Sequence, residues 1–250
     1  MKKLLSVVFL LIPGLVMASE GGVPLDKALV DLHNMESLKN GAKSFATYCM
    51  GCHSADYMRY NRIGRDLGMT PAEVDGLITT RSESGDKTKS GQLMKIAMQP
   101  EYAKQAFGTK VPDLTVIARA RGADYLYTYL RTFYIDDSRP SGMNNIAFKD
   151  VAMPHVLWEL QGLQKANFKD EKDAEGNDHK VFENMEIVVP GKMSPKEYDK
   201  FVGDLVNFLV YLGEPVQTER KSMGKWVLLF LAIFGVIAYL LKKEYWKDVH

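Results

Sequence analysis

Cysteine is scarce in this sequence, because only two of the 250 residues are cysteines and both lie in the segment CMGCH. A framework of several disulfide bonds is therefore excluded. An excess of charge of one sign is also lacking: 32 Lys and Arg residues stand against 31 Asp and Glu residues, for a formal net charge of +1. Nucleic-acid-binding proteins usually present a strongly basic face, so we expect no nucleic acid as a partner.

Long hydrophobic runs are confined to the two ends of the sequence. At the N-terminus two lysines precede an apolar run from Leu4 to Leu15, and small residues follow it up to Ala18. This order is typical of a secretory signal peptide. We therefore expect residues 1–18 to be cleaved during export, and not to remain as an N-terminal anchor.

The C-terminal run, Trp226–Leu241, contains no charged residue and has lysines on both sides. As a helix it would be roughly 24 Å long, slightly less than the hydrocarbon layer, and the flanking lysines can reach the interface. A buried core helix would normally keep a polar stripe, which is missing here. We therefore expect a transmembrane anchor at 223–243. The positive-inside rule then predicts a cytoplasmic tail at 244–250 and an exported domain at 19–222.

Between its ends the sequence predicts a mostly helical domain without internal repeats. Strand signals are weak, and EIVVP at residues 186–190 is the best of them. The segment 135–154 is rich in Asp, Ser, Pro, Gly and Asn and indicates an ordered loop, whereas residues 165–180 indicate a charged surface insertion. Capping boxes at Thr70 and Ser194 mark two helix starts. The expected helices are 35–48, 70–80, 112–133 with an interruption at Gly122, and 194–212.

The segment CMGCH combines Cys49, Cys52 and His53. A disulfide bond is the simplest interpretation in an exported chain. A thiol redox motif would need a βαβ pattern and a zinc site would need further ligands at suitable spacing, and the sequence predicts neither. The pattern is typical of covalent haem attachment: each thiol adds to one vinyl group, and the histidine lies beneath the iron. We therefore expect one c-type haem, with Cys49 and Cys52 as tethers and His53 as an axial ligand.

The ligand on the other side of the iron determines what such a haem does. A methionine sulfur raises the reduction potential and suits electron transfer, whereas an open position suits catalysis or gas sensing. Most of the 13 methionines must be ordinary core residues. Two of them fit the pattern: Met193, just before the last predicted helix of the domain, and Met153, in a loop that Pro154 stiffens. The pattern by itself leaves both alternatives open.

Several further segments match one protein family in its order along the chain. They are GAKSFATYCMGCHS, YMRYNR, PDLTVIARARGADYLYTYL, AMPHV and KEYDKFVGDLVNFLVYLGEP, followed by the apolar C-terminal run. On these segments the sequence resembles the cytochrome c1 family, the haem subunits of cytochrome bc1 complexes. The resemblance covers nearly the whole mature chain. It implies a mainly α fold: a class I cytochrome c-like haem domain with insertions, plus one C-terminal transmembrane helix.

The resemblance also implies roles for individual residues. The family's axial methionine precedes a proline in the segment that matches AMPHV, so Met153 is expected as the second axial ligand with His53. Arg121 matches an arginine that the family directs at a haem propionate, a carboxylate that needs such a partner. Tyr125 matches a tyrosine near the same pocket. Some members have a second proline where this chain has His155, which makes His155 a rival for the sixth position.

From the resemblance we expect an electron-transfer subunit of a respiratory cytochrome bc1 complex in a bacterial inner membrane, with its haem domain in the periplasm. It would carry electrons from a Rieske iron–sulfur protein to a soluble cytochrome c, with its anchor packed against cytochrome b in a dimeric complex. The chain itself would be an electron carrier and no enzyme, within a quinol–cytochrome c oxidoreductase. Two alternatives remain: a membrane-anchored electron shuttle outside such a complex, and a five-coordinate haem enzyme or sensor.

Overall fold

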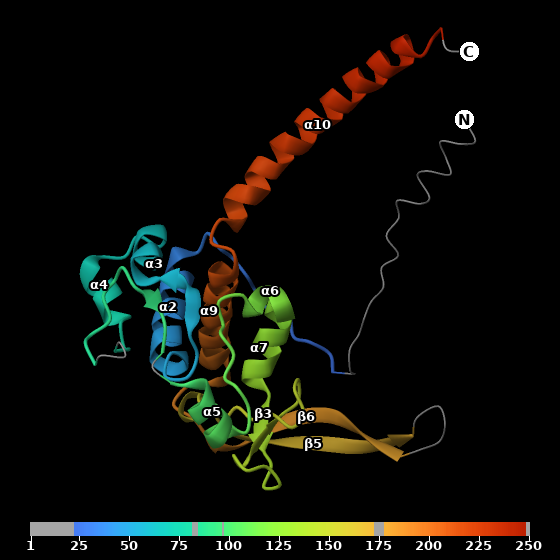
Figure 1. The fold of residues 1–250 in the computed structure, drawn as a ribbon. Coiled ribbons are helices and arrows are strands. Elements are labelled where there is room, and N and C mark those ends of the chain that lie inside the picture. The colour runs from blue at the N-terminus through green and yellow to red at the C-terminus, as the bar shows by residue number, and fades with distance from the viewer. Residues whose placement is uncertain (1–22, 82–84, 97, 173–177, 249–250) are drawn as a thin grey trace.

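A body of packed helices and hairpins and one long projecting helix make up the chain (Figure 1). This computed structural model describes residues 23–81, 85–96, 98–172 and 178–248. The predicted signal peptide, residues 1–18, lies outside the described residues, so the fold does not test that prediction.

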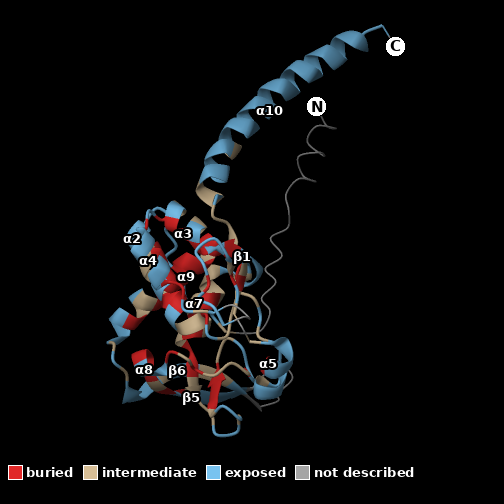
Figure 2. Ribbon diagram, turned by 60° about the vertical axis from the view of Figure 1, so that its left-hand side comes forward, coloured by how far each residue is buried: buried red, intermediate tan, exposed pale blue. Residues whose placement is uncertain are grey.

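The projecting helix α10, Gln217–Tyr245, has no buried residue (Figure 2). Its side chains from Lys225 onward are all exposed, and its most apolar stretch has a mean hydropathy of 2.1. Among the described residues it is the one helix long and apolar enough to cross a membrane. An apolar helix that the protein leaves uncovered needs another apolar environment. The structure thus has the predicted C-terminal apolar helix.

The centre of the body is a pair of helices, α2 (Met35–Ser44) and α9 (Pro195–Gly213). The predicted capping box starts α9: the Ser194 hydroxyl accepts from the Glu197 N–H, and the Glu197 carboxylate accepts from the Ser194 N–H at 2.8 Å. The two helices touch at Gly41, where any Cβ would overlap the backbone of α9. This close approach requires glycine. Fully buried side chains on the pair include Leu38, Val202, Leu205 and Phe208.

The predicted helix 35–48 changes its winding just before the CMGCH segment. The α-helix ends at Ser44, and a π-helix, η1 (Phe45–Cys49), continues it. The Met50 N–H donates to the Phe45 carbonyl at 3.1 Å, which closes the wider turn. Single π-helical turns occur frequently at functional sites. Because η1 ends at Cys49, the cysteine motif begins where the helix stops.

Two helices in the middle of the chain, α6 (Ile117–Arg121) and α7 (Ala123–Arg131), meet at Gly122. The φ angle of this glycine is +86°, a conformation that L side chains rarely adopt. The predicted interruption at Gly122 is therefore confirmed. The second helix ends at Arg131, two residues before the predicted end at Phe133.

The predicted start of this helical region at Pro112 is wrong, because α6 begins only at Ile117. The Asp113 carboxylate accepts the N–H groups of Asp56 at 2.7 Å and Thr115 at 2.8 Å. A side chain that bonds backbone groups in this way competes with helix formation. The segment from Pro112 is consequently held in a non-helical course against the residues that follow CMGCH.

Shorter elements follow the cysteine motif along the chain. The helix predicted at 70–80 begins at the expected capping box of Thr70 and Glu73, but it already ends at Gly76. The first two strands pair antiparallel. These elements are β1 (Ala55–Arg59), α3 (Tyr60–Asp66), α4 (Pro71–Gly76), β2 (Leu93–Met94) and α5 (Pro100–Phe107).

The predicted loop 135–154 begins with a short β-hairpin and stays without helix or strand after Asn145, and the predicted charged surface insertion 165–180 belongs to a second, long hairpin. β3 (Phe133–Ile135) pairs with β4 (Met143–Asn145). After the short helix α8 (Trp158–Gln161), β5 and β6 form a long hairpin that extends from the body (Figure 1). Beyond the base of the hairpin most described side chains are exposed, so the alternation of apolar and polar residues that identifies a strand is missing. The long strands are β5 (Gly162–Lys172) and β6 (Asp178–Pro190).

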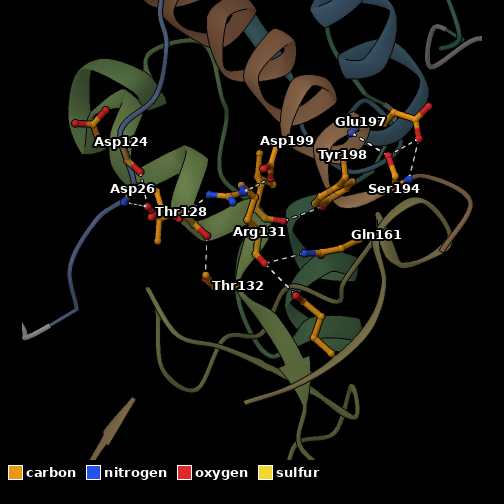
Figure 3. Close-up of polar contacts among 12 residues, drawn as sticks. Asp26, Asp124, Thr128, Arg131, Thr132, Gln161, Ser194, Glu197, Tyr198 and Asp199 are labelled. Atoms are coloured by element: carbon orange, nitrogen blue, oxygen red, sulfur yellow. Dashed lines mark hydrogen bonds and ion pairs between the residues drawn. The ribbon is translucent and has the colours of Figure 1, made fainter. Parts of the chain in front are cut away.

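A polar network ties the end of α7 to three other parts of the chain (Figure 3). The Arg131 guanidinium pairs with Asp26 at 2.5 Å and with Asp199 at 2.6 Å. The side-chain amide of Gln161 donates to the Arg131 carbonyl at 2.7 Å. The N-terminal segment, α9 and α8, which directly precedes the long hairpin, are thereby fixed relative to α7.

Candidate functional site

A cavity of about 270 Å³ lies between the CMGCH turn, the segment before α6, the helices α7 and α9, and the segment after β4. Its walls are mostly apolar, with Leu126, Leu205 and Leu209 among them. All six predicted site residues line it, although they come from distant parts of the sequence. These residues are Cys49, Cys52, His53, Arg121, Tyr125 and Met153.

The CMGCH segment forms one tight turn at the cavity wall. The N–H groups of Cys52 and His53 both donate to the Cys49 carbonyl, at 3.1 and 2.8 Å. Both cysteines are free, so the disulfide alternative has no support in the structure. Burial and the neighbouring Cys52 raise the pKa of the Cys49 thiol to about 12, so this sulfur is a neutral thiol. In the described part of the chain no group of three or more Cys, His, Asp or Glu residues could hold a bare metal ion.

His53 is held by the non-helical segment that crosses the motif. Its Nδ1 lies 2.8 Å from the Pro112 carbonyl oxygen, a bond in which the ring N–H donates. Burial lowers the pKa of His53, while the Pro112 bond and nearby Asp113 oppose that shift. A neutral imidazole with Nδ1–H engaged leaves the Nε2 lone pair free for a metal. The late start of the predicted helix, at Ile117 and not at Pro112, therefore has a function, because an α-helix from Pro112 would lose this contact.

Met153 enters the cavity from a loop whose backbone is fixed a few residues earlier. Asp150 has a φ of +62°, its N–H donates to the Asn144 side-chain oxygen at 2.8 Å, and its carboxylate pairs with Arg139 at 3.1 Å. The Met153 sulfur accepts a hydrogen bond from the Tyr129 hydroxyl at 3.3 Å. This loop thus presents a thioether to the cavity that also holds His53.

The two rival ligands lie elsewhere. The His155 side chain is buried and stacks on Phe133, with ring centroids 4.8 Å apart and planes at 5°. Burial lowers the pKa of His155 to about 4. Met193 is half-buried against the core, and its backbone N–H donates to the Leu160 carbonyl. Neither His155 nor Met193 lines the cavity, whereas Met153 does.

The charged residues that line the cavity are both cations, Lys110 and Arg121. The Arg121 guanidinium lies 5.6 Å from the centre of the Tyr125 ring. Among the described residues it has no carboxylate partner, in contrast to Arg119, which pairs with Glu214 at 3.0 Å. An unpaired guanidinium beside an apolar cavity is suited to bind a carboxylate of a ligand.

Several lining residues escaped the sequence analysis. The apolar ones gave no distinct signal, because core residues show the same spacing. Tyr129 could have been found, since it lies four residues after Tyr125 and hence on the same face of a helix. The residues missed include Phe107, Lys110, Tyr129 and Phe148.

A family model described as the cytochrome c1 family matches residues 26–181 and 191–249. The chain belongs to the cytochrome c1 family. Among curated relatives, cytochrome c1 of Allochromatium vinosum is 46% identical over the whole of both chains. The ammonia monooxygenase gamma subunit of Nitrosomonas europaea is 48% identical over 100% of this chain and 99% of its own. Cytochrome c1 of Rhodospirillum rubrum is 24% identical over 96% of this chain and 94% of its own.

Membership of the cytochrome c1 family confirms the predicted family, fold class and cofactor. The protein carries a covalently bound c-type haem, and its two cysteines have the matching spacing. It is an electron-transport protein of the cytochrome bc1 type, and its C-terminal apolar helix agrees with an inner-membrane protein. The cavity fits this cofactor, because it offers free thiols, a neutral imidazole, a thioether, two cations and apolar walls.

Proposed function

We propose that Cys49 and Cys52 tether the haem and that His53 and Met153 are its axial ligands. Convergence on one cavity carries this proposal, because the cysteine turn and the Met153 loop reach it from different parts of the fold. When bound, the haem iron accepts and releases one electron. Imidazole and thioether ligands together favour the reduced state, which suits electron transfer.

The remaining residues of the cavity prepare it for that chemistry. The apolar walls exclude water, and a low dielectric makes each nearby charge and hydrogen bond more effective. The Arg121 guanidinium would bind a haem propionate, which supplies the carboxylate partner that the described part of the chain does not. Tyr125, under this guanidinium, keeps it at the cavity edge.

The protein then serves as the electron-transfer subunit of a dimeric respiratory cytochrome bc1 complex. It takes single electrons from a Rieske iron–sulfur protein and delivers them to a soluble cytochrome c. It is an electron carrier, and the assembled complex has the quinol–cytochrome c oxidoreductase activity. The helix α10 packs against cytochrome b, which supplies the apolar surroundings that its exposed side chains require.

The proposed topology follows from the two ends of the chain. Residues 1–18 direct export and are cleaved, 19–222 form the periplasmic haem domain, 223–243 span the membrane, and 244–250 stay in the cytoplasm. Lys242 and Lys243, at the end of α10, support this orientation because cytoplasmic ends carry an excess of cations.

The ligand assignment is tested by Met153→Leu, compared with Met193→Leu as the matched control. We expect Met153→Leu to lose the low-spin spectrum or exchange its ligand, with a much lower reduction potential, since leucine cannot bind iron. Met193→Leu should keep the wild-type spectrum and potential, because that side chain does not line the cavity. An unchanged spectrum in Met153→Leu would contradict the assignment.

Association and ligand binding distinguish the alternative functions. In the proposed complex, the tagged chain co-purifies with cytochrome b and a Rieske protein. A chain that always purifies alone would favour the membrane-anchored shuttle. Rapid binding of carbon monoxide to the native ferrous protein would favour an open iron site, as in a haem enzyme or sensor.

A further inference from the structure

Tyr129 is the cavity residue that reaches the proposed sulfur ligand. Its hydroxyl donates to the Met153 sulfur, with 3.3 Å between oxygen and sulfur. Among the described residues this sulfur is the one hydrogen-bond partner of the hydroxyl. Towards a thioether, which only accepts, this hydroxyl must be the donor.

The position of the Tyr129 ring is set by the helix and strand around it. The ring stacks on Tyr125, with centroids 6.0 Å apart and planes at 19°. It also packs edge-to-face against Phe133, with ring centroids 5.2 Å apart. The Asn145 side-chain amide donates to the Tyr129 backbone carbonyl at 2.7 Å. Such packing holds the hydroxyl in place and fixes the direction from which it approaches the Met153 sulfur.

We propose that Tyr129 is a positioning residue that hydrogen-bonds the Met153 sulfur in the ligated state and thereby raises the reduction potential of the haem. This inference rests on the proposed role of Met153 as axial ligand. A thioether sulfur has two lone pairs, so one can bind iron while the other accepts a hydrogen bond. The hydrogen bond withdraws electron density from the sulfur. Because a less electron-rich sulfur stabilises ferric iron less, the ferrous state is favoured.

The test is Tyr129→Phe in the full-length, haem-loaded protein, because this change removes the hydroxyl and keeps the ring. We expect the equilibrium constant for haem reduction to fall roughly twofold to tenfold, the usual effect of one hydrogen bond. A tenfold fall is about 59 mV for one electron. The spectrum should stay low-spin, while the weak sulfur-to-iron charge-transfer band shifts. A residue that only supports packing would not shift this band.

Tyr127→Phe is the matched control. Tyr127 lies on the same helix, its ring is 4.6 Å from the Arg131 guanidinium, and it does not line the cavity. Its variant should keep the wild-type potential. If Tyr129→Phe and Tyr127→Phe had equal reduction potentials while methionine ligation stayed intact, the inference about Tyr129 would be overturned. The assignment of Met153 as ligand would stand. If Met153→Leu retained the charge-transfer band, the ligand assignment would fail and this inference with it.

A measurement on the unaltered protein covers the case in which Tyr129→Phe does not assemble. In the diamagnetic ferrous state, proton NMR should show a slowly exchanging Tyr129 hydroxyl with a nuclear Overhauser effect to the Met153 methyl group. Such a signal supports the hydrogen bond. Its absence, with both resonances assigned, would overturn the proposal.

Discussion

Helix α7 contributes to two cavities of similar volume. They differ in whether the cations that line them have carboxylate partners. The first, of about 270 Å³, is the proposed haem site, where Lys110 and Arg121 have no carboxylate partner in the described part of the chain. The second, of about 220 Å³, is lined by Arg131 together with both of its carboxylate partners, Asp26 and Asp199 (Figure 3).

The comparison shows how a binding site differs from a structural one built on the same helix. Buried polar groups need partners, because an unpaired one costs free energy. Around Arg131 the chain supplies these partners itself, and the network joins four segments. The Arg121 guanidinium is exposed and has no carboxylate partner in the described part of the chain, so a ligand with carboxylates can reach it and pair with it. Lys110 and Arg121 therefore stay available to a ligand at the edge of the first cavity, whereas the paired ions around Arg131 form a structural contact.

The largest expected effect comes from removing both tethers of the first cavity. In the double variant Cys49→Ser and Cys52→Ser we expect no covalently attached haem, since a hydroxyl does not replace a thiol in the thioether bond. Mass spectrometry of the denatured, purified protein measures this directly. Each single variant should keep at most one thioether.

Met50→Leu serves as the control for that experiment. Met50 lies between the two cysteines but is buried in the core and does not line the cavity. The variant should keep the full mass of the attached haem. A haem adduct in the double cysteine variant would contradict the assigned tethers.

An intermediate effect is expected from the second cavity. Arg131→Met leaves Asp26 and Asp199 without their cation and should lower the free energy of unfolding by about 1–3 kcal/mol. This value lies between the effects typical of exposed and of buried ion pairs. The haem potential should not change, because Arg131 does not line the first cavity. Denaturant titration and redox titration measure the two quantities.

Arg220→Met is the control, because the exposed Arg220 pairs with Glu214, and Glu214 keeps a second cation, Arg119, when Arg220 is replaced. The loss of Arg220 should lower the free energy of unfolding less than the loss of Arg131 does, because an exposed cation contributes little to stability. Equal stability losses in the two arginine variants would show that the Arg131 network is no stronger than an ordinary surface pair.

The smallest effect is expected at Arg121. Arg121→Gln should change the free energy of unfolding of the haem-free chain by less than about 0.5 kcal/mol, since no carboxylate of the described chain pairs with it. In the haem-loaded protein the reduction equilibrium constant should fall roughly twofold to fivefold, because a nearby cation favours the less positive ferrous state. Arg119→Gln, which removes the pair with Glu214, is the control and should leave the potential unchanged.

Local signals gave the predictions that the structure confirms. The capping box at Ser194 and the interruption at Gly122 depend on a few neighbouring residues, so both could be read from the sequence. The start at Pro112 was wrong because Asp113 bonds Asp56, more than fifty positions earlier. In the long β5–β6 hairpin only EIVVP, residues 186–190 at the end of β6, gave a strand signal; the rest was missed because its exposed strands lack the apolar alternation that marks a strand.

The sequence by itself determined the covalent haem motif and the apolar C-terminal helix, because two thiols, a histidine and an unbroken apolar run are local patterns. Spacing alone did not decide which methionine lines the cavity or which arginine lacks a carboxylate partner in the described part of the chain; the tertiary structure decided both. Met153 and Met193 both fit the pattern, and the packing of α7, α9 and the loop after β4 turns one of them into the cavity. Such convergence arises from long-range contacts, which spacing along the chain does not encode.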